Sequence, residues 1–184
     1  MPAYLLLAFT ENSVDVVVAR SEESDYLRIE SSHKFDLRLA ELPVAIAENA
    51  PEPELSPLPE EPETETQQKL AALDHIKNII RSLGEDLELL PVVLRSPMIS
   101  FHTLDLPFKD PSRLAQIVPI QIQDNVPFDL GEFVCACSAL RSESVVGYEI
   151  LATLAPIREI AHIISFMQAL HLEPKVITTT SVAL

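Results

Sequence analysis

Cys135 and Cys137 are the residues whose type and spacing come nearest to a chemical site in this 184-residue chain. At positions i and i+2 of a strand, two thiols lie on one face and could hold a soft metal ion. A structural zinc site needs four ligands. The chain has no second cysteine pair, and its five histidines show no HxxxH or HExxH spacing. The pair is therefore interpreted as two small core residues, and no metal site is expected.

Other catalytic patterns are missing as well. Loops that bind phosphate depend on glycine, and the chain has three: Gly84, Gly131 and Gly147. The sequence contains no GxxxxGK[ST], GxGxxG or GxSxG motif. We therefore expect no catalytic residue and no cofactor, so the chain is not expected to be an enzyme.

The charge balance limits the partners. The 28 acidic and 13 basic residues give a net charge of −15. This excess argues against nucleic acid and against an anionic membrane surface, because both attract basic patches. No run of about 18 apolar residues predicts a membrane-spanning helix. The N-terminus does not resemble a signal peptide, and the two cysteines favour a reducing compartment.

The first half of the chain reads as strands followed by a helix. Apolar or β-branched runs separated by polar turns predict an antiparallel meander over residues 4–9, 13–20 and 25–37. Residues 48–66 contain five prolines and seven glutamates and no basic residue, so they are predicted to be a disordered loop. A helix with apolar residues at a helical period follows and ends at Gly84.

The second half alternates strands and helices. Strands are predicted over 87–94 and 98–108, and a helix is predicted from Asp110-Pro111, with Pro119 expected to kink or interrupt it. The later elements are a β-hairpin, a helix from Pro156 and a last strand over residues 173–180. The order predicts an α/β fold with a mixed sheet.

Two Pro-Phe corners frame the helix after Asp110. Leu106-Pro107-Phe108 ends the preceding strand, and Val126-Pro127-Phe128-Asp129 ends the helix. Each proline ends an element, and each phenylalanine can hold the turn against the core.

These corners, followed by Leu172-Glu173-Pro174-Lys175-Val176-Ile177, occur in the order and spacing of a known superfamily. The chain resembles the cytoplasmic region of type II secretion protein L and the type IV pilus assembly protein M. The resemblance implies the first half of an actin-like (RNase H-like) fold with an inserted small α/β subdomain. The implied domains are 1–94, 95–174 as the insertion, and 175–184 as the start of a second half.

The resemblance also implies a function. It implies a non-catalytic scaffold in the bacterial cytoplasm, peripheral to or tethered at the inner membrane, which recruits the motor ATPase and neighbouring platform proteins. The alternatives are a pilus M-like adaptor that binds the N-terminal peptide of a membrane protein, and a diverged actin-like ATP-binding protein. The glycine-free first hairpin, residues 8–13, favours the secretion branch. Neither membrane insertion nor nucleic acid is expected, and a homodimer is allowed.

The two corners are the candidate partner-binding surface. Its residues are Leu106, Pro107, Phe108, Pro127, Phe128, Asp129 and Leu130. The alternative is that these residues serve only to pack the turns.

Overall fold

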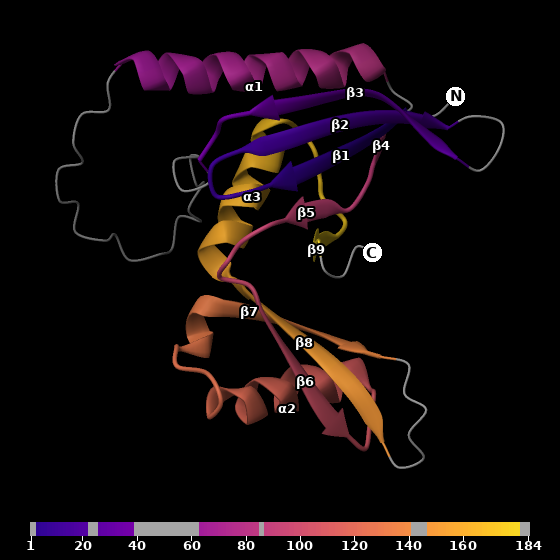
Figure 1. Cartoon of the computed structure of the whole chain (residues 1–184), viewed down its shortest axis with the longest axis vertical. Helices are drawn as coiled ribbons and strands as arrows, with labels where there is room; N and C mark the ends of the chain where they lie inside the picture. The colour runs from indigo at the N-terminus through magenta and orange to yellow at the C-terminus, as the bar shows by residue number, and fades with distance from the viewer. Residues whose placement is uncertain (1–2, 22–25, 39–62, 85–86, 141–146, 181–184) are drawn as a thin grey trace. The chain divides into compact units, whose positions relative to one another are not determined.

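The computed structural model of the chain describes residues 3–21, 26–38, 63–84, 87–140 and 147–180. The chain divides into two units, one formed by Met1–Arg95 with His162–Leu184 and the other by Ser96–Ala161. Each unit contains its own β-sheet (Figure 1). The predicted mixed α/β class is therefore confirmed.

The first unit begins with the predicted antiparallel meander. Strands β1 (Ala3–Phe9), β2 (Val14–Ser21) and β3 (Leu27–Phe35) pair in sequence, with one register shift between Val18 and Ala19. Parallel strands then extend the sheet on the far side of β1, in the order β3-β2-β1-β5-β9, with β4 also beside β1.

The strand predicted over 87–94 is two strands, β4 (Leu87–Leu89) and β5 (Val92–Leu94). β4 pairs with the start of β1 and β5 with its end. The Leu90 N–H still donates to the Leu5 carbonyl at 2.9 Å, but Pro91 has no N–H with which to continue the ladder. The single-strand prediction was therefore wrong at Pro91.

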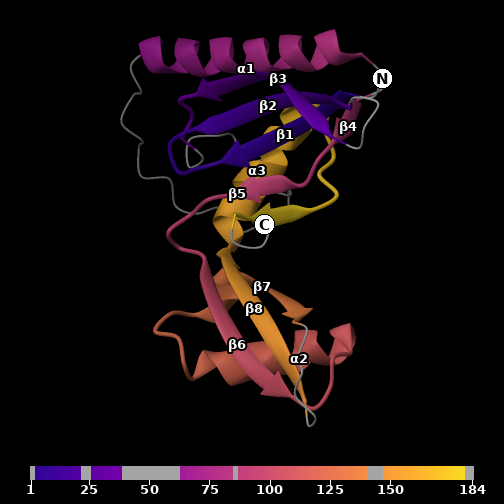
Figure 2. The ribbon, with the colours of Figure 1, turned by 45° about the vertical axis from the view of Figure 1, so that its right-hand side comes forward.

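One face of this sheet is buried, because successive side chains of a strand alternate between its two faces. The fully buried row comprises Leu5, Leu7, Phe9, Val14, Val16 and Val18. Helix α3 (Ile157–Ala169) packs Phe166 edge-on against Phe9, with ring centroids 5.4 Å apart. Helix α1 (Glu63–Leu83) lies beside β3 (Figures 1 and 2). The His75 ring of α1 packs on the Phe35 ring of β3, with ring centroids also 5.4 Å apart.

Helix α1 confirms the predicted helix, and Gly84 follows it at φ +79°, where glycine is favoured. The predicted disordered loop was 48–66. Residues 48–62 of it lie outside the described residues, and residues 63–66 form the start of α1. The loop prediction was therefore wrong for those last four residues.

The second unit is a three-stranded antiparallel sheet with one helix. Strands β6 (Ser100–Leu106), β7 (Phe133–Ala139) and β8 (Tyr148–Pro156) lie in the order β6-β8-β7, and the predicted β7–β8 hairpin is confirmed. Helix α2 (Pro111–Gln123) buries Leu114, Val118 and Ile122. They form the core with Leu106, Ile150, Ala152 and Leu154.

Helix α2 starts as predicted, since the Asp110 carboxylate accepts the Arg113 N–H at 3.0 Å and Pro111 follows it. The helix runs through Pro119 to Gln123, so of the predicted kink or interruption, the interruption does not occur. Burial of Val118 and Ile122 on either side of the proline offsets the hydrogen bond that Pro119 cannot donate.

The unit boundaries differ from the predicted domains at the C-terminal side. The insertion was predicted to reach residue 174, but the first unit already includes His162 onwards. The reason is that Ile163, Phe166 and Met167 are buried and Phe166 packs on Phe9. Strand β9 (Ile177–Thr179) pairs with β5, so residues 177–179 complete the first sheet instead of opening a second half.

Candidate partner-binding pocket of the second unit

The first predicted corner lies at the far end of β6. Leu106 is buried in the core, Phe108 is half-buried against that core, and Pro107 is exposed. Leu106 pairs with Tyr148 at the start of β8. Two of these three residues are therefore largely committed to packing, and only Pro107 faces solvent.

The second corner is built in a similar way. Phe128 and Leu130 are half-buried on the core, whereas Pro127 and Asp129 are exposed. The Asp129 carboxylate accepts the Gly131 N–H at 2.8 Å and so caps a short 3₁₀ helix, η2 (Leu130–Glu132). This cap fixes the direction in which the chain leaves the corner and enters β7.

The structure does not bring the two corners together. Leu106 pairs with Tyr148 at one end of β8, and Phe133, which follows the second corner, pairs with Pro156 at the other end. The length of β8 therefore separates them. The seven predicted residues do not form one continuous surface, and the second corner leads directly into a cavity.

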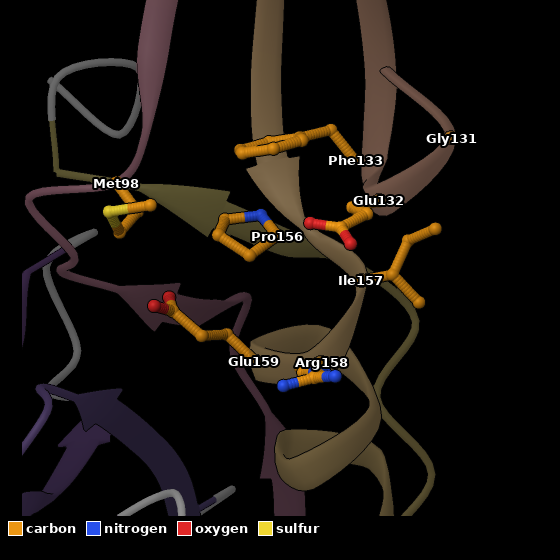
Figure 3. A pocket seen from close by; sticks show the side chains of 8 residues that line it. All are labelled: Met98, Gly131, Glu132, Phe133, Pro156, Ile157, Arg158 and Glu159. Carbon is orange, nitrogen blue, oxygen red and sulfur yellow. The ribbon is translucent and has the colours of Figure 1, made fainter. Parts of the chain in front are cut away.

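That cavity has a volume of about 490 Å³ and is lined by Met98, Gly131, Glu132, Phe133, Pro156, Ile157, Arg158 and Glu159. Its residues come from the turn before β6, from η2 and the start of β7, and from the junction of β8 with α3 (Figure 3). Met98 and Ile157 are large apolar side chains that are 54% and 44% exposed. An apolar side chain of a partner could cover both of them.

The charged groups of the pocket are two carboxylates and one guanidinium. The Glu159 carboxylate accepts a hydrogen bond from the Ser96 hydroxyl at 2.8 Å. The same hydroxyl accepts the Met98 N–H at 3.1 Å, which holds Met98 at the rim. Figure 3 shows the Glu132 carboxylate beside Pro156. The two carboxylates outnumber the one guanidinium, so this apolar hollow fits an apolar side chain that has a basic neighbour.

Sequence reasoning missed this pocket. Only the neighbouring Pro127–Leu130 segment was proposed, and Met98, Phe133 and the 156–159 segment were interpreted as parts of strands and a helix. They come together only because the β6–β8–β7 register places the start of β6 and of β7 at the end of β8. An apolar residue next to a helix-initiating proline, Ile157 after Pro156, is a weak signal on its own.

Cys135 and Cys137 lie on the same face of β7, as predicted, with their sulfurs 3.9 Å apart. Burial, and then the neighbouring Cys137 sulfur, raise the pKa of Cys135 to about 12, and burial also raises the pKa of Cys137. Both are therefore neutral thiols at pH 7, whereas a nucleophile or a metal ligand would be a thiolate. No cluster of three or more metal-binding side chains occurs among the residues that the structure describes.

The first hairpin closes on itself between Thr10 and Ser13. The Thr10 hydroxyl oxygen accepts the N–H groups of Ser13 at 2.9 Å and Asn12 at 3.3 Å, and the Thr10 N–H donates to the Ser13 carbonyl at 2.9 Å. In a phosphate-binding turn such N–H groups point at the ligand. Here they are used within the turn.

The chain resembles known proteins in its structure. No protein-family model matches the chain, and no curated protein matches it in sequence. Among solved structures, it matches the cytoplasmic domain of EpsL, an inner-membrane component of the type II secretion system of Vibrio cholerae. That match has a TM-score of 0.59 and 11% identity, and it covers 99% of this chain and 59% of the EpsL chain.

A second match is the PilM–PilN type IV pilus biogenesis complex, with a TM-score of 0.62 and 13% identity. The chain has the GspL/PilM-like, actin-like fold. The predicted resemblance is confirmed at the level of fold by these two structures. The PilM–PilN match covers 98% of this chain and 48% of the matched chain. This chain therefore spans about half to three-fifths of the length of the two matched GspL/PilM-like chains.

The two structural neighbours come from a secretion system and a pilus biogenesis complex. The EpsL structure is that of a cytoplasmic domain of an inner-membrane protein. In the part of this chain that the structure describes, no helix is both long and apolar enough to span a membrane.

Proposed function

We propose that this chain is a non-catalytic scaffold of an inner-membrane assembly platform, like the type II secretion L protein. The observation that carries the proposal is the match of nearly the whole chain to the EpsL cytoplasmic domain. In this role the chain recruits the motor ATPase and neighbouring platform proteins in the bacterial cytoplasm. Its mechanism is surface complementarity, without bond-making chemistry.

Two features support a scaffold over an enzyme. The N–H groups of Thr10, Asn12 and Ser13 in the first hairpin are engaged inside the turn, so these three are not available as donors to a nucleotide phosphate. The two cysteines are neutral thiols packed towards a core, which makes them poor nucleophiles.

The pocket of the second unit supports a second candidate, an adaptor of the pilus M type. The PilM–PilN structure is that of a complex, and a partner segment with one apolar side chain and a basic neighbour would fit the pocket at Met98 and Ile157. Both candidates assign the same role to the pocket and differ in the partner.

The experiment is a pull-down with the chain as bait from detergent-solubilised cells of its host, read by mass spectrometry. We expect a secretion or pilus motor ATPase, or an inner-membrane platform protein, to be enriched. The identity of the enriched protein distinguishes the two candidates.

Two variants make the pull-down specific. Ile157→Glu places a charge in the pocket and should abolish the enrichment. Ile120→Glu is the matched control, because Ile120 is 72% exposed on α2 of the same unit and lies outside the pocket. Absence of every platform protein from the wild-type pull-down would refute the proposed function, and equal loss with both variants would refute the role of the pocket.

A further inference from the structure

Strand β7 is an edge strand without the usual protection against pairing. It lies at one end of the order β6-β8-β7, and its sequence Phe-Val-Cys-Ala-Cys-Ser-Ala contains no charged residue and no proline. Natural edge strands usually carry charges, prolines or bulges that prevent association. The other long edge strands here do: β6 carries Asp105, and β3 carries Arg28, Glu30 and Lys34.

The hydrogen-bond pattern identifies the backbone groups on the free edge. The Leu140 N–H donates to the Glu149 carbonyl at 2.8 Å, which continues the β7–β8 ladder by one pair. Hydrogen-bonded and non-hydrogen-bonded pairs alternate along an antiparallel ladder. Val134, Ala136 and Ser138 therefore bond to β8. The N–H and C=O groups of Cys135 and Cys137 point to the opposite edge, where no other strand pairs with β7 in the part of the chain that the structure describes.

The side chains of β7 leave room for another strand. Ala136 and Ser138 are small and exposed on the sheet face opposite α2, and Val134 is 43% exposed on the same face. Cys135 and Cys137 are half-buried on the α2 side. Two copies of a chain with a net charge of −15 repel each other across most surfaces, and β7 offers an approach without charges.

We propose that β7 pairs antiparallel with β7 of a second copy of this chain, about a two-fold axis at Ala136. This register pairs all the residues of β7, with Ala136 opposite Ala136 and Cys135 opposite Cys137 of the second copy. The free N–H and C=O groups of Cys135 and Cys137 then bond to each other across the axis. The two sheets become one, and the unprotected edge is removed. This inference does not depend on the proposed function.

The register is tested by disulfide formation in the full chain. In a Cys135→Ser, Cys137→Ser background, Ala136→Cys places two thiols opposite each other in a non-hydrogen-bonded pair. Cα atoms in such pairs are about 4.5 Å apart, within the range of disulfides. Oxidised glutathione accepts the two electrons and two protons that the thiols lose. Ser138→Cys is the matched control, since its opposite residue is Val134 of the second copy.

We expect the Ala136→Cys protein to become a covalent dimer at least tenfold faster than the Ser138→Cys protein. Equal rates for the two proteins would overturn the register. Sedimentation velocity tests the dimer itself. Ala136→Lys brings two like charges together at the axis and should give a monomer with an unchanged circular dichroism spectrum.

Thr103→Lys, on an exposed residue of β6, serves as the control and should stay dimeric. A wild-type chain that remains monomeric at all concentrations would overturn the proposal. So would a dimer that persists in Ala136→Lys.

Discussion

The ring of Phe128 stacks on the ring of Phe133, with centroids 4.4 Å apart and ring planes 28° apart. Phe128 belongs to the second Pro-Phe corner, and Phe133 lines the candidate pocket. The corner therefore positions one wall of the pocket. The exposed neighbours of Phe128, Pro127 and Asp129, are the only parts of this corner that a partner could contact without displacing packed side chains.

Replacing Phe128 tests this positioning role. We expect Phe128→Ala to lower the free energy of unfolding by about 1–3 kcal/mol, because it removes the stack and half-buried apolar area. Phe128→Leu should lose less, since it keeps most of the apolar area. Urea unfolding followed by circular dichroism measures both values. Phe101→Ala, at an exposed phenylalanine of the same unit, should change stability by less than about 1 kcal/mol, and an equal loss there would contradict the argument.

Much of the fold could be predicted because local signals agreed with each other. The cap at Asp110-Pro111, the apolar period of α1 and the alternation in β1 and β2 each indicated an element that the structure contains. These signals act over a few residues, so the sequence alone displays them. The Pro91 break was visible as well, but the apolar run on both sides of it favoured one strand.

The pocket and the unit boundary could not be predicted, because both depend on pairing between distant segments. Phe133 and Pro156 are opposite each other only in the β7–β8 register, and Phe166 contacts Phe9 only after α3 packs on the first sheet. No local pattern encodes either contact. The two corners appeared equivalent in sequence, and only the register placed them at opposite ends of β8.

Thr10 provides the second prediction. Thr10→Val keeps the shape of the side chain and removes the oxygen that accepts the N–H of the buried Ser13. The free energy of unfolding should fall by about 1–3 kcal/mol, the cost of a buried donor that loses its partner. Thr10→Ser is the control and should remain close to wild type. Chemical denaturation distinguishes the two, and a Thr10→Val protein as stable as Thr10→Ser would show that the turn does not need this bond.

The same hairpin predicts the response of this chain to nucleotide. Because its Thr10, Asn12 and Ser13 N–H groups are engaged within the turn, we expect Mg-ATP to leave the melting temperature unchanged in a thermal-shift assay. A ligand present at 100 times its dissociation constant would add about 2.7 kcal/mol of stability. A clear rise in the melting temperature would therefore favour the ATP-binding alternative over the scaffold.

Pro119 predicts a stabilising substitution. Within the continuous helix α2, the proline removes one backbone hydrogen bond, so Pro119→Ala should raise the free energy of unfolding by about 1–3 kcal/mol. Pro111→Ala is the matched control. At the first helical position the missing N–H has no intrahelical partner, and no gain is expected there. Thermal and urea unfolding of the two variants give the comparison, and a gain at Pro111 equal to that at Pro119 would refute the explanation.

The cysteine pair predicts slow alkylation of Cys135 and a dependence of the free energy of unfolding on pH. With its pKa raised from 9.0 to about 12, Cys135 is almost fully protonated at pH 8, and iodoacetamide should alkylate it more slowly in the folded chain than in urea. Below pH 9 the thiol is neutral in both states, so it adds no pH dependence. Between pH 9 and 12 the unfolded chain loses the proton and the folded chain keeps it. The free energy of unfolding should therefore fall as the pH rises through this range. Cys135→Ala removes this contribution, and an identical alkaline profile for that variant and the wild type would contradict the raised pKa.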